Sequence, residues 1–78
     1  MEIGKNITIL KTAVGSLPSV SLINELKKNN MRVIGVDSDP NSIGFNFCDK
    51  SYVVPNATQK TFLKKIIQIC NKEKPNVI

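Results

Sequence analysis

The chain has 78 residues, of which 41% are hydrophobic and 22% are charged, and its formal net charge is +5. This length allows one small domain, and the balance of apolar and charged residues is typical of a globular protein and excludes a disordered chain. No apolar run approaches the length of a membrane-spanning helix, and the first residues lack the apolar core of a signal peptide. We therefore expect one domain over residues 1–78 of a soluble, cytoplasmic protein that does not bind membranes.

The positive net charge does not predict nucleic-acid binding. Most of the excess comes from lysines in one segment whose other residues are strongly periodic, so a solvated helix face explains it. The chain also lacks the aromatic signature of RNA-binding sheets, a glycine-flanked loop that clamps nucleotides, and zinc-finger spacing. The lysines concerned are Lys60, Lys64, Lys65, Lys72 and Lys74.

The cysteine pattern indicates neither a redox motif nor a zinc site. Cys48 and Cys70 are too far apart for a CxxC motif, and the chain has no histidine. We predict two buried, reduced thiols.

The first half of the chain has the pattern of a strand, a helix and a second strand. Residues 7–12 are rich in β-branched side chains and predict a strand, which ends before a turn at Gly15 and Ser16. Residues 17–29 predict a helix that Ser16 caps and that tolerates Pro18 in its first turn. The apolar positions at helical spacing are Val20, Leu22, Ile23 and Leu26.

Residues 31–36 predict the central strand of the fold. Val33, Ile34 and Val36 form a nearly continuous β-branched block, which suits a strand buried on both faces. Strand, helix and strand within about thirty residues form a βαβ unit, whose right-handed crossover makes the two strands parallel.

The second half of the chain repeats this alternation. Residues 41–49 predict an irregular turn of helix, and residues 50–55 predict a third strand that Pro55 places near a sheet edge. Residues 58–74 predict a helix with Thr58 as its N-cap. Its apolar stripe consists of Phe62, Leu63, Ile66, Ile67, Ile69 and Cys70.

These elements predict an α/β fold with a three-layer, Rossmann-like parallel sheet. The expected strand order is 3-2-1, with residues 76–78 beginning a fourth strand beyond the first. Because the sequence stops inside this apolar strand, we expect an amino-terminal fragment of a longer protein. A truncated fourth strand would leave the backbone of residues 7–12 unpaired, so we also expect a two-fold dimer. Either this edge pairs with itself in the second chain, or residues 76–78 of each chain reach across to the other.

Gly15 and Ser16 are candidate binding residues, because they lie at a strand-to-helix turn. Backbone N–H groups and the helix dipole at such a turn can hold an anion such as phosphate. A tight turn that needs one glycine explains the same residues. The G-x-G-x-x-G fingerprint of NAD-binding enzymes is absent, which disfavours such an enzyme.

Asp37 follows the central strand, 22 residues after Gly15. Open α/β sheets bind ligands in the crevice at the carboxyl ends of their strands, so we predict that Asp37 contacts a ligand. Asp39, which precedes Pro40, is either a second ligand contact or the acceptor of an Asx turn. The candidate substrate-binding residues are thus Gly15, Ser16, Asp37 and Asp39, and no residue is a candidate for catalysis or metal binding.

Four sequence blocks, in this order and spacing, resemble the amino-terminal pre-ATP-grasp domain of carbamoyl-phosphate-synthase-like ATP-grasp enzymes. The blocks are TAVGS at 12–16, VIGVDSDP at 33–40, CDKSYVVP at 48–55, and FL at 62–63 leading to ICNKEK at 69–74. The resemblance covers nearly the whole chain from Asn6, and the second and third blocks are its most specific part. The chain departs from the relatives at Pro18 and Ser19, where glycine or another small residue is common, and at Cys48, where alanine is usual.

The resemblance implies that the parent protein is a ligase. Such enzymes use ATP and Mg²⁺ to activate a carboxylate as an acyl phosphate, and an amine or similar nucleophile then displaces the phosphate. The resemblance places the nucleotide and metal ligands in the two domains that follow, and it makes this domain a non-catalytic wall of the substrate cleft. The implied partners are the remaining ATP-grasp domains and a small-molecule carboxylate.

A second class of function stays open beside the ligase. The same residues fit a small, non-catalytic Rossmann-like module that binds a nucleotide or a partner protein.

Overall fold

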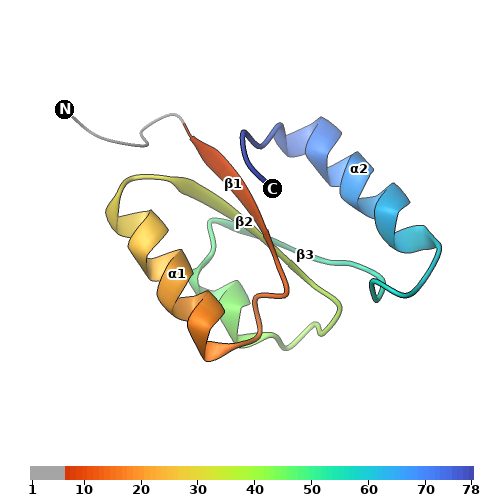
Figure 1. The fold of residues 1–78 in the computed structure, drawn as a ribbon, viewed down its shortest axis with the longest axis horizontal. Coiled ribbons are helices and arrows are strands. Elements are labelled where there is room, and N and C mark those ends of the chain that lie inside the picture. The colour runs from red at the N-terminus through yellow and green to blue at the C-terminus, as the bar shows by residue number, and fades with distance from the viewer. Residues whose placement is uncertain (1–6) are drawn as a thin grey trace.

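The computed structural model of the protein describes residues 7–78 (Figure 1). Three strands alternate with two α-helices and one short 3-10 helix, in the order that the sequence predicts. The elements are β1 (Thr8–Thr12), α1 (Leu17–Lys28), β2 (Arg32–Asp37), η1 (Ile43–Phe47), β3 (Lys50–Val53) and α2 (Thr61–Glu73).

The three strands form one parallel sheet with β2 in the middle, which confirms the predicted α/β fold and strand order. Ile9 of β1 pairs with Val33 of β2, and Val36 of β2 pairs with Tyr52 of β3. Parallel pairing makes the three strands end on the same side of the molecule. The loops that follow them therefore gather at one edge of the sheet.

Residues at the end of the chain pair with the free side of β1. Val77 forms a parallel bridge with Ile9, and the N–H of Leu10 donates to the carbonyl of Val77 over 2.9 Å. The N–H of Thr8 donates to Oδ1 of Asn76 over 2.8 Å. The expected position of the fourth strand is thus confirmed, and the expectation that this edge of β1 is unpaired is wrong for Thr8 and Leu10.

Both faces of the sheet are covered by a helix. Alternate residues of a strand point to opposite sides, so each face presents apolar side chains. Leu10, Ile34 and Val36 point to one face, where they form a buried cluster with α2. Val33 points to the other face, where it packs with Ile23 of α1. Figure 1 shows the two helices on either side of the sheet, so the fold has the three predicted layers.

Helix α1 begins at the predicted residue and ends one residue before the predicted Asn29. Oγ of Ser16 accepts the N–H of Ser19 over 3.3 Å, which confirms Ser16 as the N-cap. Lys27 and Lys28 lie in the last turn, where their positive charges interact favourably with the negative end of the helix dipole. Asn30 adopts a left-handed conformation with φ of 63° and leads the chain into β2.

Helix α2 begins three residues later than predicted, and Thr58 is not its N-cap. Lys60 occupies the cap position and makes no side-chain cap bond. The reason is a separate turn around Asn56, whose Oδ1 accepts both the N–H and the hydroxyl of Thr58 over 3.1 Å. The helix therefore begins at Thr61, and Thr58 lies outside its cap position.

The two thiols are free and half-buried, so they are less buried than predicted. Sγ of Cys48 donates to the carbonyl of Gly44 over 3.3 Å. A Cβ on Gly35 would lie 2.4 Å from this sulfur, so the glycine in the middle of β2 makes room for Cys48.

Within residues 7–78, neither helix has the length and apolar composition needed to cross a membrane.

Candidate functional site

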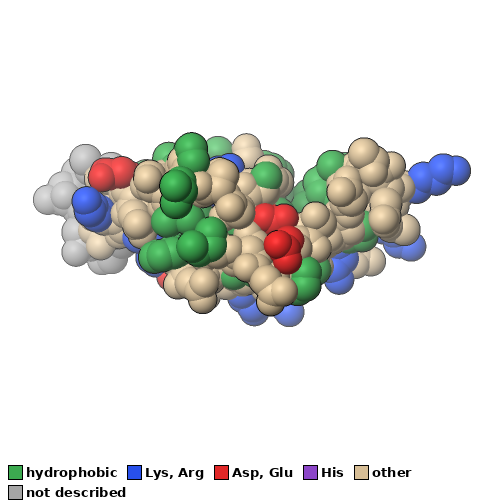
Figure 2. All heavy atoms as spheres, turned by 90° about the horizontal axis from the view of Figure 1, so that it is seen from below, with side chains coloured by type: hydrophobic (Ala, Val, Ile, Leu, Met, Phe, Trp, Pro, Cys, Tyr) green, Lys and Arg blue, Asp and Glu red, His purple; other side chains and the backbone are tan. Residues whose placement is uncertain are grey.

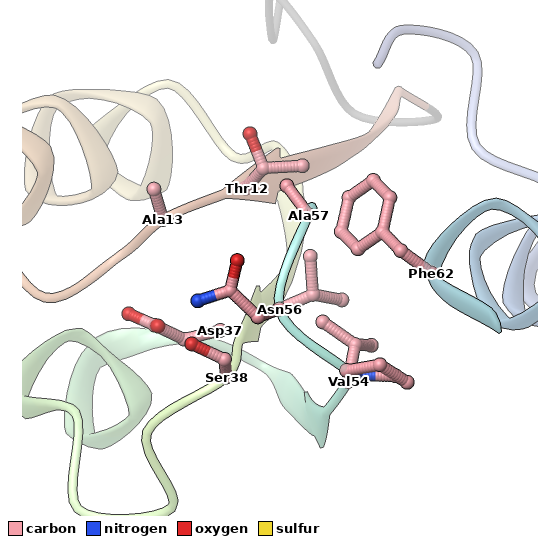
Figure 3. Close-up of a pocket in the computed structure, with 10 residues that line it drawn as sticks. Thr12, Ala13, Asp37, Ser38, Val54, Asn56, Ala57 and Phe62 are labelled. Carbon is pink, nitrogen blue, oxygen red and sulfur yellow. The ribbon is translucent and has the colours of Figure 1, made fainter. Parts of the chain in front are cut away.

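A cavity of about 260 Å³ lies at the carboxyl ends of the strands. Loops that follow all three strands form its walls, and the first turn of α2 closes one side (Figure 3). This is where an open parallel sheet is expected to bind a ligand, because neighbouring loops diverge there. The lining residues are Thr12, Ala13, Val36, Asp37, Ser38, Val54, Pro55, Asn56, Ala57 and Phe62.

Asp37 is a half-buried residue of this wall, and it is held from two sides. Its Oδ2 accepts the hydroxyl of Ser42 over 2.8 Å, and its Oδ1 accepts the N–H of Asp39 over 3.3 Å. Its carbonyl accepts the N–H of Val54 over 2.9 Å, which ties the end of β2 to the segment after β3. The carboxylate therefore has a fixed position, and each oxygen keeps lone pairs for a further donor.

Gly15 lies behind Asp37 and does not line the cavity. A Cβ on Gly15 would be 3.1 Å from Oδ2 of Asp37 and 3.1 Å from Oγ of Ser42, which is tighter than an ordinary contact. The small residue thus lets the first loop approach the carboxylate. Because that carboxylate is negatively charged, it opposes a phosphate at this turn.

Ser16 is occupied as a helix cap. Besides accepting the N–H of Ser19, its hydroxyl donates to Oγ of Ser19 over 2.9 Å. The hydroxyl of Ser19 in turn donates to the carbonyl of Ala13 over 3.1 Å. These bonds hold Ala13 in its left-handed conformation, with φ of 54°, at the edge of the cavity.

Asp39 forms the turn that follows β2. Its Oδ1 accepts the N–H of Asn41 over 2.9 Å, and its carbonyl accepts the N–H of Ser42 over 3.1 Å. This is the Asx turn that the sequence left as one of two interpretations. Among the four candidate residues, only Asp37 is part of the described cavity lining.

The sequence interpretation missed Thr12, Asn56 and Phe62, which also line the cavity. Thr12 is the last residue of β1, as Asp37 is of β2, and Asn56 lies shortly after β3, so the rule that selected Asp37 could have found them. Phe62 could not be found in this way, because its place depends on where α2 begins.

The polar and apolar parts of the lining lie on different sides. In Figure 3, Asp37 and Ser38 lie together on one side, and Val54 and Phe62 lie on the other, with Asn56 between them. Figure 2 views the molecule from below Figure 1 and shows acidic side chains near the middle of the face, whereas Lys and Arg side chains lie toward its rim.

A scan against known families gives one match over residues 9–78, to the PylC-like N-terminal domain. The chain belongs to this family. The PylC-like N-terminal domain is of the pre-ATP-grasp type, which confirms that part of the resemblance. No curated protein matches the chain. In this PylC-like domain the cavity described above is the candidate functional site.

Proposed function

We propose that this domain walls the substrate cleft of an ATP-dependent ligase of the ATP-grasp class. In this proposal the enzyme joins a carboxylate to an amine, or to a similar nucleophile, through an acyl phosphate, as carbamoyl-phosphate-synthase-like enzymes do. The domain binds part of a substrate and does not catalyse the reaction alone. The cavity at the carboxyl ends of the three strands supports this most directly, because it is lined by loops that a neighbouring domain can cover.

ATP and Mg²⁺ belong to other domains of the parent enzyme in this proposal. Among residues 7–78, no three side chains of the histidine, cysteine, aspartate or glutamate type come together as a metal cluster. We assign no residue of this chain to the nucleotide or the metal. The proposed partners are the remaining ATP-grasp domains and a small-molecule carboxylate, in the cytoplasm.

Asp37 is the residue that we propose to contact substrate, whereas Gly15, Ser16 and Asp39 shape the loops around it. The test is the Asp37→Ala variant of the full-length protein. We expect ATP-dependent ligation to fall at least about tenfold, while the free energy of unfolding changes by about 1 kcal/mol or less, because a partly exposed carboxylate is rarely worth more.

Two measurements check this expectation. Release of ADP in the presence of candidate carboxylates and amines reports ligation, and urea unfolding of the same samples reports stability. If Asp37→Ala unfolds the protein but the folded fraction keeps its specific activity, Asp37 has a structural role only. A full-length protein that binds nucleotide without releasing ADP would favour the non-catalytic module.

A further inference from the structure

The cavity has an unusual charge balance for a domain with a net charge of +5. Among its lining residues, Asp37 is the only one with a charged side chain. The basic residue Lys11 directly precedes the lining residue Thr12. Its Nζ donates to the carbonyl of Thr12 over 2.8 Å, and Lys11 does not line the cavity. A ligand in this cavity therefore meets one negative charge and no positive charge from the lining.

Three neutral polar side chains extend the wall around Asp37. Thr12 and Ser38 each carry a hydroxyl oxygen that can accept a hydrogen bond, whereas Oδ1 of Asn56 already accepts two from Thr58. An ammonium group carries three N–H donors and has no acceptor. Its donors thus match a wall that offers one carboxylate and two hydroxyl oxygens.

The opposite wall of the cavity is apolar and can contact the hydrocarbon part of a ligand. Phe62 and Val54 lie across the cavity from Asp37 and Ser38 in Figure 3, and Pro55 also lines the cavity. Methylene groups bound there leave water, which favours binding. A ligand that spans the cavity would therefore carry its charge at one end and an aliphatic chain at the other.

We propose that this cavity binds a protonated aliphatic amine, with its ammonium group on Asp37 and its hydrocarbon chain against Phe62 and Val54. The proposal rests on the proposed function only in treating this ligand as a substrate of the ligase. An amine held as ammonium has no lone pair and cannot attack an acyl phosphate. The bound group therefore recognises the substrate, and the reacting group is elsewhere on the same molecule.

The test is a titration of the 78-residue chain, followed by the amide shifts of its NMR spectrum. The probes are n-butylammonium, n-butanol and butyrate at equal ionic strength. We expect n-butylammonium to give saturable shifts at Ala13, Ser38 and Asn56, with a Kd on the order of 10 mM for so small a ligand. Butanol should bind about fivefold more weakly, and butyrate should give no saturable shift at these amides.

Asp37→Asn removes the charge while keeping an oxygen that can accept the hydroxyl of Ser42. We expect it to weaken n-butylammonium binding about fivefold. The matched control is Glu25→Gln, which removes one negative charge from an exposed position on α1 and should change Kd by less than about twofold. The comparison of n-butylammonium with butanol needs no variant, so it decides the matter even if Asp37→Asn fails to fold.

Equal or tighter binding of butyrate or butanol would overturn the proposal, as would equal losses in the two variants. Failure of the ligase assignment looks different. If n-butylammonium binds in an Asp37-dependent way but the protein shows no ATP-dependent ligation, the amine-binding site is supported and the ligase function is contradicted. If the protein shows ATP-dependent ligation but no preference for n-butylammonium, the ligase function is supported and the amine-binding site is contradicted.

Discussion

Glu73 is the most strongly engaged charged side chain in the described part of the protein. It is 6% exposed, and it connects the end of α2 to the amino-terminal ends of two strands. The hydroxyl of Tyr52 donates to its Oε2, Arg32 contacts its Oε1 at 2.8 Å, and Lys50 lies 3.4 Å from Oε2. The hydrogen bond from Tyr52, followed by that from Arg32, lowers the pKa of Glu73 from 4.5 to about 2.

The lowered pKa of Glu73 makes stability depend on pH in the acid range. A carboxylate whose folded pKa lies below its unfolded value stabilises the protein above the unfolded pKa, and this contribution is lost as the pH falls through the folded pKa. The window is therefore about pH 4.5 down to about 2. Above this window the contribution of Glu73 is complete.

We expect Glu73→Gln to lower the free energy of unfolding at pH 7 by about 2 kcal/mol. The loss stays below that of a fully buried pair, because the side chains of Arg32 and Lys50 are 44% and 45% exposed and can be hydrated. Urea unfolding at pH 7 and at pH 2 measures the effect, and the difference from wild type should shrink at the lower pH.

Glu25→Gln is the control for this prediction. Glu25 is 66% exposed and lies 3.4 Å from Lys28, so its removal should change the free energy of unfolding by less than about 0.5 kcal/mol. A loss from Glu73→Gln that is equally large at pH 2 and pH 7 would mean that packing, and not charge, is the cause.

At the scale of single elements, the two helices differ in how far local signals determine where they begin. Helix α1 begins where the sequence predicts, because Ser16 and Pro18 lie two positions apart in the chain and act on the first turn alone. Helix α2 begins later, because Asn56 captures Thr58 in a turn of its own. Because the side chain of Thr58 can bond either to the turn before it or to the helix after it, the sequence alone does not determine where α2 begins.

This difference predicts unequal effects for two similar substitutions. Ser16→Ala removes a hydroxyl that accepts the N–H of Ser19, so we expect it to lower the free energy of unfolding by about 1 kcal/mol. Thr58→Ala removes an exposed hydroxyl that caps no helix, so its effect should stay below about 0.5 kcal/mol. Urea midpoints of the two variants give the comparison. Equal losses would mean that Thr58 has a capping role that the structure does not show.

The sheet was predictable from sequence, because each of its determinants is local or follows from chain geometry. Val33, Ile34 and Val36 are buried in the centre as their β-branched run predicts. The site was predictable only in part. Asp37 follows from the rule on strand ends, whereas the exclusion of Ser16 and Asp39 from the cavity lining depends on bonds to Ser19 and Asn41. Such bonds become visible only when the loop conformations are known.

Tight loop packing at the site also escapes sequence reasoning. A Cβ on Gly44 would lie 1.9 Å from the carbonyl oxygen of Val14, so η1 touches the backbone of the first loop. This contact, together with that of Gly15 on Asp37, packs the loop between β1 and α1 against the segment between β2 and β3. The glycines are plain in the sequence, but the partner of each one is set by the tertiary fold.

For the whole molecule, we expect two chains to associate through the edge of the sheet beside β1. In the described residues Asn76 and Val77 form this edge, because they pair with β1 at Thr8, Ile9 and Leu10. Val77 and Ile78 are 52% and 73% exposed. An exposed apolar edge can pair with a second chain, and a two-fold contact between identical edges closes on itself.

We therefore keep the prediction of a homodimer but move its contact from β1 to residues 76–78. Sedimentation equilibrium over a range of concentrations should show reversible association. Val77→Lys should weaken it, because a charge on an edge strand opposes pairing. Leu17→Lys is the control, since Leu17 is 76% exposed but begins α1, away from this edge.

The amides of Thr8 and Leu10 should be protected from exchange at every concentration, because their bonds to Asn76 and Val77 lie within one chain. A single species at the monomer mass across all concentrations would contradict the dimer, whereas amide protection that appears only on association would contradict the pairing of these residues within the chain.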